Sequence, residues 1–123
     1  MTGIDLRGRR VLVVEDEMMI AMLVEDMLSD LGCDVVGPAH GLESALKLAS
    51  EELNLDAALL DVNLAGQPVF AVADALRAKG VPAIFSTGYG EAGLRDVDAG
   101  AQVLQKPFRA GDLQRALNTA LGG

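Results

Sequence analysis

The sequence predicts an α/β fold in which helices cover both faces of a single parallel sheet of five strands. Short apolar segments and amphipathic helical patterns alternate five times along the 123 residues. The apolar segments are continuous rather than alternating, which is typical of strands buried on both faces. This alternation favours a doubly wound parallel sheet, because right-handed crossovers leave few other topologies.

Five apolar segments have strand character, and each ends at a polar residue or a turn signal. They are residues 11–14, 33–36, 57–60, 82–85 and 101–104. The second segment has the weakest pattern, and Gly37-Pro38 is expected to close it. We therefore expect five short strands, of which the second is the least well defined.

Helical patterns lie between the strands, with apolar residues at spacings of three and four. They cover residues 20–31, 42–53, 69–76 and 113–121. The first pattern includes both Leu23 and Leu28 among its apolar positions. Gly32 and Gly80 follow the first and third patterns, where they are expected to stop the helices.

The segment between the fourth and fifth strands, residues 88–99, has the weakest helical pattern. It contains Gly90 and Gly93, and only Leu94 and Val97 are strongly apolar. We expect a short or mobile fourth helix there. At this length a flavodoxin-like (βα)5 sheet with strand order 2-1-3-4-5 is the natural arrangement, and residues 1–123 are expected to form one domain.

Composition limits the classes of partner. The formal net charge is −8, which argues against a nucleic-acid partner, because phosphate binding requires clustered Lys and Arg. No segment approaches the length of a membrane span, and no apolar signal core follows the charged N-terminus. We therefore expect a cytoplasmic protein that binds neither nucleic acid nor membrane.

Several reactive or polarisable residues are interpreted without a role in the chemistry. Cys33 is the single cysteine, so no internal disulfide is possible, and its apolar neighbours predict a buried structural thiol. His40 follows Pro38 in an expected loop, and no second histidine supports a relay or a metal site. The methionines of the first helix either fill the core or form a patch that faces a partner; they are Met18, Met19, Met22 and Met27.

Polar residues stand at the carboxyl ends of four predicted strands. Glu15 and Asp16 follow the first strand, and Asp61 follows the third. Thr87 follows the fourth strand, and Lys106 follows the fifth. In an open parallel sheet these strand ends line the ligand crevice. We therefore expect three carboxylates, one hydroxyl and one ammonium to converge there.

Carboxylates this close repel one another and raise each other's pKa. A divalent cation such as Mg²⁺, with its preference for oxygen ligands, could hold them ionised, and so could Lys106. Mg²⁺ could also neutralise the charge of a phosphoryl group. Asp61 would then be free to attack the phosphorus atom and form an aspartyl-phosphate. Each residue taken alone could be a helix start, a cap or a surface turn. Four matching strand ends in order favour a joint site.

The sequence resembles the response-regulator receiver family of two-component and phosphorelay signalling over nearly its whole length. The matching pieces are Val-Leu-Val-Val-Glu-Asp-Glu at residues 11–17, Ala-Leu-Leu-Asp-Val-Asn-Leu at residues 58–64, Thr87, and Lys-Pro-Phe at residues 106–108. The ordered set with its spacing is specific to the family. The resemblance implies that Asp61 accepts a phosphoryl group from a histidine kinase or a histidine phosphotransfer protein.

The resemblance also implies a role for each residue around Asp61. Asp16 would bind Mg²⁺ directly, Glu15 would act largely through a metal-bound water, and the backbone carbonyl of Asn63 would complete the protein's share of the coordination. Thr87 would hydrogen-bond one phosphoryl oxygen, and Lys106 would pair with another. The protein would then be a signalling module rather than an enzyme, limited to self-directed phosphotransfer and autodephosphorylation.

Residues 85–89, Phe-Ser-Thr-Gly-Tyr, resemble the Phe-Ala-Thr-Gly-Tyr signature of a bacterial receiver subgroup nicknamed FAT GUY. Most receivers carry an aromatic switch residue three positions before the lysine, where this chain has Val103. Tyr89 is the substitute that the subgroup suggests, acting together with Thr87. We hypothesise that activation orders residues 88–99 and re-aims Tyr89. This would remodel the surface of the fourth helix, fifth strand and fifth helix, where a downstream protein binds.

Alternative functions remain open from the sequence. A haloacid-dehalogenase-type phosphatase also places a nucleophilic Asp after an apolar strand, but its second Asp two residues later is Asn63 here. A receiver-like module that binds partners without phosphorylation is the other alternative. A nucleotide-binding domain is remote, because no glycine-rich phosphate loop follows the first strand. The chain is expected to act as a free-standing receiver or as a piece of a hybrid kinase.

Overall fold

A computed structural model describes residues 5–64, 66–88 and 94–122, and its main sheet has the predicted topology. The strands of this sheet are β1 (Arg10–Val14), β2 (Asp34–Ala39), β3 (Ala57–Asp61), β6 (Ala83–Thr87) and β7 (Gln102–Gln105). Their order is β2-β1-β3-β6-β7, and every neighbouring pair is parallel. Numbered along the chain, these five strands have the predicted order 2-1-3-4-5.

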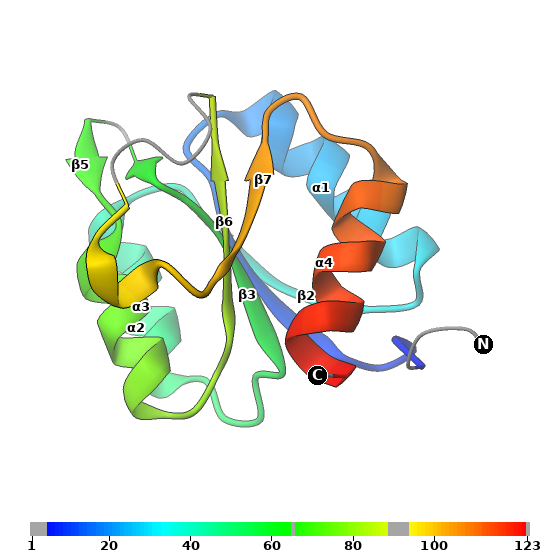
Figure 1. Cartoon of the computed structure of the whole chain (residues 1–123), viewed down its shortest axis with the longest axis horizontal. Coiled ribbons are helices and arrows are strands. Elements are labelled where there is room, and N and C mark those ends of the chain that lie inside the picture. The colour runs from blue at the N-terminus through cyan, green and yellow to red at the C-terminus, as the bar shows by residue number, and fades with distance from the viewer. Residues whose placement is uncertain (1–4, 65, 89–93, 123) are drawn as a thin grey trace.

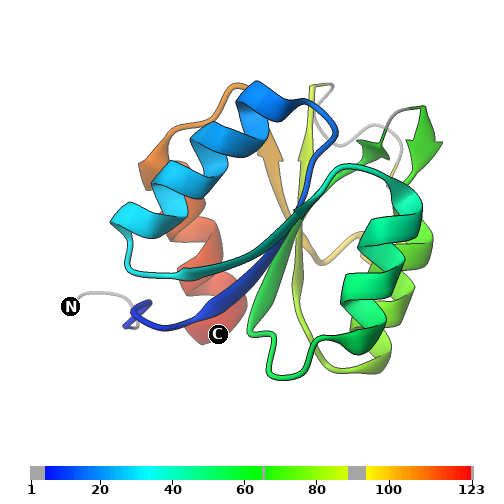
Figure 2. The same cartoon turned by 180° about the vertical axis from the view of Figure 1, so that it is seen from behind.

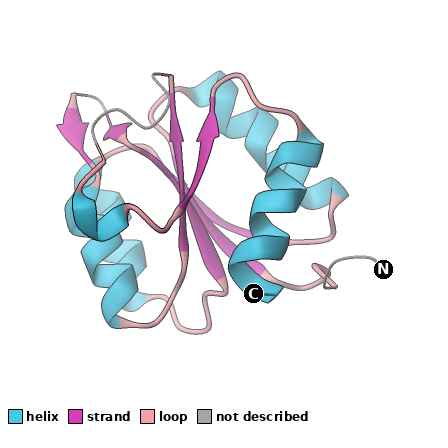
Figure 3. Ribbon diagram, in the orientation of Figure 1, coloured by secondary structure: helices cyan, strands magenta, loops and turns pink. Residues whose placement is uncertain are grey.

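Two helices cover each face of this sheet in the part of the chain that the structure describes (Figure 1). The pair α1 (Met18–Asp30) and α4 (Ala110–Gly122) lies on one face, and the pair α2 (Leu42–Glu51) and α3 (Phe70–Ala78) lies on the other. The view from behind shows the same division (Figure 2). Helices therefore form the two outer layers around the strands (Figure 3). None of the described helices is long and apolar enough to span a bilayer.

Neighbouring residues of each central strand face opposite sides of the sheet. In β1, Val11 and Val13 pack into the core beneath α1 and α4, whereas Leu12 and Val14 pack into the core beneath α2 and α3. Residues of β3 and β6 divide between the two cores in the same way. Both faces of these strands are buried, which explains why their sequences are continuously apolar.

The second strand runs further than the sequence predicts. Gly37-Pro38 was expected to close it, but β2 continues to Ala39. The expectation was wrong because β2 is an edge strand, where a proline without an N–H group is tolerated. Its register with β1 shifts near this point. Gly37 has φ of 95°, and a Cβ there would lie 3.1 Å from the carbonyl oxygen of Val13.

The apolar stripe that the sequence predicts for residues 20–31 is wider than the face of α1 that is buried in the structure. Val24 and Leu28 are buried against the sheet, as the spacing predicts, and Ala21, which was not part of the predicted pattern, is buried as well. Leu23 belongs to the same pattern, yet its side chain is 57% exposed. An apolar stripe with spacings of three and four is wider than the face that touches the sheet. The exposed face of α1, as the term is used below, consists of Met18, Met19, Met22 and Leu23.

The segment between β6 and β7 contains a single 3-10 turn among its described residues. This turn, η1, covers Asp96–Asp98, and no α-helix lies between residues 94 and 101. The finding agrees with the prediction of a short fourth helix. Residues 89–93 lie outside the described part of the chain, so the predictions for Tyr89, Gly90 and Gly93 stay predictions.

A small hairpin follows β3 on the side of the sheet where the strands end. Strand β4 (Asn63–Leu64) pairs antiparallel with β5 (Gln67–Pro68), with Leu64 opposite Gln67. Gly66 lies in the turn with φ of 84°, a conformation that glycine adopts without steric cost. The hairpin begins at Asn63, two residues after Asp61, which keeps the backbone of Asn63 close to the end of β3.

Cys33 has the structural role that the sequence predicts. Its side chain is buried in the core beneath α1 and α4. Burial and the nearby carboxylates of Asp34 and Asp56 raise the pKa of the thiol above its ordinary value. The thiolate, which is the reactive form, is therefore disfavoured.

The contrast within α1 is directly testable. Leu28→Ala is expected to lower the free energy of unfolding by about 2–5 kcal/mol, because it opens a cavity at a fully buried position. Leu23→Ala is the matched control on the same helix, and its effect is expected to stay within about 0.5 kcal/mol. Urea denaturation measures both. Equal destabilisation by the two changes would contradict the orientation of α1.

Candidate functional site

The carboxyl ends of four parallel strands meet at one edge of the sheet. Strand β1 leads directly into Glu15 and Asp16, β3 ends at Asp61, β6 ends at Thr87, and Lys106 follows β7. A pocket of about 420 Å³ opens there. Its lining residues are Asp16, Glu17, Asp61, Asn63, Gly66, Thr87, Gly88 and Lys106. The residues predicted from strand ends are therefore brought together, with Glu15 buried beside the pocket.

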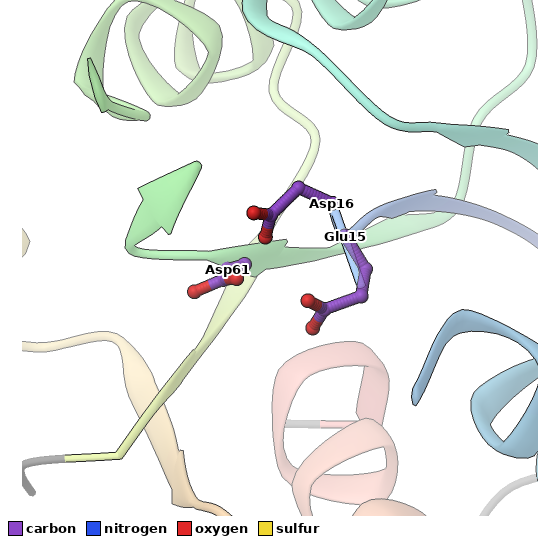
Figure 4. Close-up of side chains that lie close together, drawn as sticks. All are labelled: Glu15, Asp16 and Asp61. Atoms are coloured by element: carbon purple, nitrogen blue, oxygen red, sulfur yellow. The ribbon is translucent and has the colours of Figure 1, made fainter. Parts of the chain in front are cut away.

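Three carboxylates form the acidic part of this site. Glu15, Asp16 and Asp61 each offer one oxygen, and these atoms all lie within 4.8 Å of one another. Figure 4 shows the three side chains gathered at the ends of β1 and β3. Glu15 and Asp61 are buried, with 3% and 6% of their surface exposed, and Asp16 is partly buried. This spacing is compatible with a single cation held among the three carboxylates.

Lys106 supplies the positive charge opposite the acids. Its Nζ atom lies 2.9 Å from Oε1 of Glu15 and donates a hydrogen bond of 3.2 Å to Oδ2 of Asp61. Only 17% of the lysine side chain is exposed. Burial alone would lower the pKa of Lys106, but the hydrogen bond to Glu15 and the two carboxylate charges outweigh it and raise that pKa. The lysine therefore stays protonated.

The surroundings of Asp61 disfavour the ionised form of its carboxyl group. Burial, followed by the charge of Glu15, raises the pKa of Asp61 to about 7. Lys106 opposes this rise but does not cancel it, because its single charge is shared between two buried carboxylates. The uncompensated negative charge makes the site attractive to a divalent cation.

Backbone N–H groups orient two of the carboxylates. The N–H of Asn63 donates to Oδ1 of Asp61 at 3.2 Å, and the N–H of Glu17 donates to Oε2 of Glu15 at 3.2 Å. Glu17 is the residue immediately before α1, so the N-terminus of this helix faces the site. The positive end of the helix dipole there favours anions. Sequence reasoning did not assign Glu17 to the site.

Thr87 is positioned at the end of β6. Its side chain is buried, and it lines the pocket beside Gly88. The carbonyl oxygen of Thr87 accepts a hydrogen bond of 2.8 Å from the backbone N–H of Lys106. This bond ties the end of β6 to the residue that follows β7. A displacement of Thr87 therefore also acts on the backbone of Lys106.

His40 touches the site through the backbone only. It follows β2, and its Nδ1 atom lies 2.9 Å from the carbonyl oxygen of Glu15. The imidazole ring is exposed. His40 thus contacts the backbone at the end of β1, and it is not among the residues that line the acidic pocket.

Val103 lies on β7 opposite Phe85 and is partly buried. It occupies the place where most receivers carry an aromatic switch residue, as the resemblance indicates. The proposed substitute, Tyr89, lies outside the described residues. The pairing of Tyr89 with Thr87 therefore stays a prediction.

The donor set fits a hard divalent cation. Carboxylate and carbonyl oxygens are the ligands that Mg²⁺ takes in proteins, usually with several waters. The described site offers three carboxylates and a partly open pocket that leaves room for further ligands. Lys106 adds one positive charge beside Glu15 and Asp61. With a divalent cation bound as well, the site could therefore accept one additional anion.

Comparison with known proteins identifies the same architecture elsewhere. The sequence matches the family described as "Response regulator receiver domain" over residues 11–118. It is 35% identical over 114 residues to the phyllosphere-induced regulator PhyR of Methylorubrum extorquens. That alignment covers 90% of this chain and 43% of PhyR. The chain spans about half the length of the curated relatives that it matches.

Solved structures agree with this match over nearly the whole fold. The solution structure of SdrG from Sphingomonas melonis Fr1 has a TM-score of 0.82 and 36% identity, covering 98% of this chain and 100% of SdrG. The receiver domain of the sensor histidine kinase PA1611 from Pseudomonas aeruginosa PAO1 has a TM-score of 0.81 and 30% identity. That alignment covers 94% of this chain and 99% of the receiver domain, whose structure has a magnesium ion coordinated in its active site cleft.

The raised pKa of Asp61 predicts a pH dependence of stability without metal. The folded state holds its proton up to a pKa of about 7, whereas the unfolded chain releases it near the ordinary value of 3.8. This group therefore favours the folded state at low pH, and the advantage is lost as pH rises through that window. Asp61→Asn is expected to exceed the wild type in unfolding free energy above pH 7, by at least about 1 kcal/mol.

Urea denaturation in the presence of a chelator, at about pH 5 and about pH 8, measures this difference. Asp26→Asn, which removes an exposed carboxylate on α1, is the control and should show no gain. A wild type that is as stable as Asp61→Asn at the higher pH would contradict the repulsion described above.

Proposed function

This chain belongs to the response-regulator receiver family, and we propose that it accepts a phosphoryl group on Asp61 and passes the signal to a partner protein. The observation that carries the proposal is the position of Asp61. Its carboxylate is nearly buried, yet it lines an open pocket beside two further acids and one ammonium. Receivers are signalling domains of two-component systems. A single reactive carboxylate that takes up a phosphoryl group and later loses it suits that role.

The transfer step follows from the charges around Asp61. An ionised oxygen of Asp61 attacks phosphorus, and the bond from phosphorus to the donor's imidazole nitrogen breaks with its electron pair left on that nitrogen. Lys106, held beside Asp61, neutralises negative charge that moves onto the new acyl phosphate. The product is an aspartyl-phosphate, which returns to the carboxylate when water attacks phosphorus.

Mg²⁺ is the cofactor that the donor set suits. We propose that Asp16 and Asp61 hold it directly, that Glu15 acts largely through a bound water, and that the backbone carbonyl of Asn63 completes the set. When bound, the cation supplies positive charge that offsets the phosphoryl oxygens and relieves repulsion among the carboxylates. The magnesium ion in the cleft of the PA1611 receiver domain supports this assignment.

Thr87 and Lys106 are proposed to hold the phosphoryl group after transfer. The hydroxyl of Thr87 would donate to one phosphoryl oxygen, and the ammonium of Lys106 would pair with another. Both side chains line the pocket from the ends of β6 and β7, and Lys106 also reaches Glu15 after β1 at 2.9 Å. Three anionic phosphoryl oxygens would thus meet positive or donor groups on two sides.

A protein phosphodonor is favoured by the surface beside the pocket. An apolar groove of about 380 Å³ runs between α1 and the residues after β7. Its lining residues are Glu17, Ile20, Leu23, Val24, Met27, Lys106, Pro107 and Phe108. The groove adjoins the exposed face of α1, and Glu17 and Lys106 line both the groove and the acidic pocket. We propose that a histidine kinase or histidine phosphotransfer protein docks here, with apolar residues of a helix in the groove.

A phosphatase of the haloacid-dehalogenase type fits less well. Such enzymes need a general acid two residues after the nucleophile, and this chain has Asn63 there. An amide cannot transfer a proton, so the leaving group of an unrelated phosphomonoester would not be protonated. The proposal is therefore a phosphoacceptor limited to its own phosphotransfer and dephosphorylation.

We further propose that residues 1–123 form one receiver module of the Phe-x-Thr-Gly-Tyr subgroup. The sequence of residues 85–89 supports this, since only Ser86 departs from the Phe-Ala-Thr-Gly-Tyr pattern. In such a module Thr87 and Tyr89 would act as the switch. The output surface would comprise the η1 segment, β7 and α4, where a downstream partner binds.

Phosphorylation is predicted to require Asp61 and Mg²⁺ together. Acetyl phosphate, or its analogue beryllofluoride, should modify the wild type only when Mg²⁺ is present, because the cation offsets charge at the reacting carboxylate. Intact-mass spectrometry measures the acetyl phosphate product, and fluorine NMR measures bound beryllofluoride. Asp61→Asn should lose both signals, while Asp26→Asn, on the exposed side of α1, should keep them. Label that persists on Asp61→Asn would place the acceptor elsewhere.

Mg²⁺ is predicted to stabilise the protein before any phosphorylation. Binding to the folded state alone raises the unfolding free energy by about 2.7 kcal/mol when the free cation is 100 times its Kd. Thermal unfolding with chelator and with excess Mg²⁺ should therefore show a higher Tm in Mg²⁺ for the wild type. Asp16→Ala should abolish the increase, and Asp26→Ala should retain it. An unchanged Tm for the wild type would argue against the metal site.

A further inference from the structure

An ion network joins α3 to the η1 segment on the side of the molecule away from α1. Asp98 lies at the end of η1, and its side chain is only 2% exposed. Its Oδ1 atom lies 2.6 Å from Nη2 of Arg77 on α3, and its Oδ2 atom accepts a hydrogen bond of 2.8 Å from Nε of Arg95. A nearly buried carboxylate thus has an arginine from each of the two elements.

Asp74 closes the network into a ring. Its Oδ1 atom accepts a hydrogen bond of 2.8 Å from Arg95 and another of 2.8 Å from Arg77. These bonds, that of Arg95 first, lower the pKa of Asp74 to about 2. The guanidinium of Arg95 also lies over the ring of Phe70, 4.5 Å from its centroid. The η1 latch is defined here as Asp74, Arg77, Arg95 and Asp98.

Apolar packing contributes little to the attachment of η1 itself. Val97, in the middle of η1, is 67% exposed, whereas Leu94, before η1, is partly buried and packs against the core beneath α2 and α3. By contrast, Val72, Ala73 and Leu76 anchor α3 itself in the core. A pocket of about 460 Å³ lies beside the latch, so the segment is not closely packed against the sheet. The ion pairs of the latch therefore hold η1 to α3. In Figure 1, the η1 turn is drawn in gold beside α3.

Such an attachment can be reversed more easily than a packed helix. The exposed fractions of Arg77 and Asp74 are 49% and 52%, so water and salt reach part of the network. Asp98 is different, because a buried carboxylate is stable only with its partners in place. Loss of either arginine contact therefore weakens the docked position of the whole segment.

The segment is also connected to the proposed phosphorylation site along the chain. Thr87 lines the acidic pocket at the end of β6, and Arg95 is eight residues later. Phe85, two residues before Thr87 on β6, lines the same pocket as Arg77 and Asp98. Strand β6, which ends at Thr87, therefore borders the same pocket as the latch, and a movement of Thr87 toward a phosphoryl group would act on the latch through this strand.

We propose that the η1 latch holds residues 94–98 against α3 in the unphosphorylated protein, and that phosphorylation of Asp61 works against it. This inference rests on the proposed function and concerns the regulation of the same site. A latch that stabilises one state lowers the affinity of any ligand that prefers the other state. The coupling is reciprocal, so releasing the latch raises the affinity of the site for a phosphoryl analogue by the same factor.

Two variants release the latch in different ways, and a third serves as control. Asp98→Asn removes the buried charge that both arginines share. Arg77→Gln removes a half-exposed partner and leaves Asp98 paired with Arg95, so it tests the latch even if the first variant fails to fold. Glu52→Gln is the matched control, because it breaks the ion pair of Glu52 with Arg10, 2.6 Å long, in another part of the fold.

The first measurement does not depend on phosphorylation. The amides of Ala99 and Ala101 donate to the carbonyls of Asp96 and Asp98, so their hydrogen exchange reports on the segment. Both latch variants should accelerate this exchange by about fivefold or more, and high salt should accelerate it in the wild type. The Glu52→Gln rates should match those of the wild type. Unchanged rates in both latch variants would overturn the latch.

The second measurement is the affinity of the full chain for beryllofluoride in Mg²⁺, followed by fluorine NMR. Both latch variants should bind about fivefold more tightly or better than the wild type, and Glu52→Gln should bind equally. Equal or weaker binding by both, with accelerated exchange, would show an attachment that does not regulate the site and would overturn the proposal. Absence of binding by the wild type would instead remove the proposed function, and the coupling with it.

Discussion

Repulsion among Glu15, Asp16 and Asp61 is the interaction on which the chemistry of this protein depends. Water screens such repulsion poorly where two of the three side chains are almost fully buried. Lys106 offsets only part of it, which leaves the pKa of Asp61 near 7 instead of at its ordinary value. The site is therefore short of positive charge, and a bound divalent cation would offset that deficit.

The parallel sheet makes this unfavourable arrangement possible. Its central strands are buried on both faces by two pairs of helices, so their ends are held rigidly at one edge. Apolar burial in the two cores offsets the cost of gathering like charges at that edge. The match to the receiver family covers residues 11–118, so, apart from Arg10, it includes all five strands of this sheet and the four strand ends that form the site.

The elements around the sheet are held in place in two different ways. Helices α1 to α4 each bury apolar side chains against the sheet, which fixes them in place. The η1 segment instead meets α3 through the latch, with Val97 facing solvent. A signalling domain needs one element that can change position without unfolding the core. The element held by charge rather than by burial is the one that satisfies this need.

The sequence alone determined the architecture and the members of the acidic site, because both follow from local patterns. Continuous apolar strands alternating with helical spacings specify a parallel sheet, and a polar residue at the end of such a strand must lie at the carboxyl edge. Asp61, Thr87 and Lys106 could be assigned in this way without any knowledge of their distances. Tertiary structure was needed wherever two residues have the same local pattern but different surroundings. Leu23 and Leu28 share one helical stripe, yet only Leu28 meets the sheet.

Three-dimensional contacts also decided the features that join distant parts of the chain. The bond between Arg77 and Asp98 spans 21 residues, and nothing in the spacing of either segment reveals it. The pKa of Asp61 likewise depends on its depth of burial and on its distances from Glu15 and Lys106. Periodicity reports which side of an element is apolar, whereas burial and ion pairing depend on what the rest of the chain places against that side.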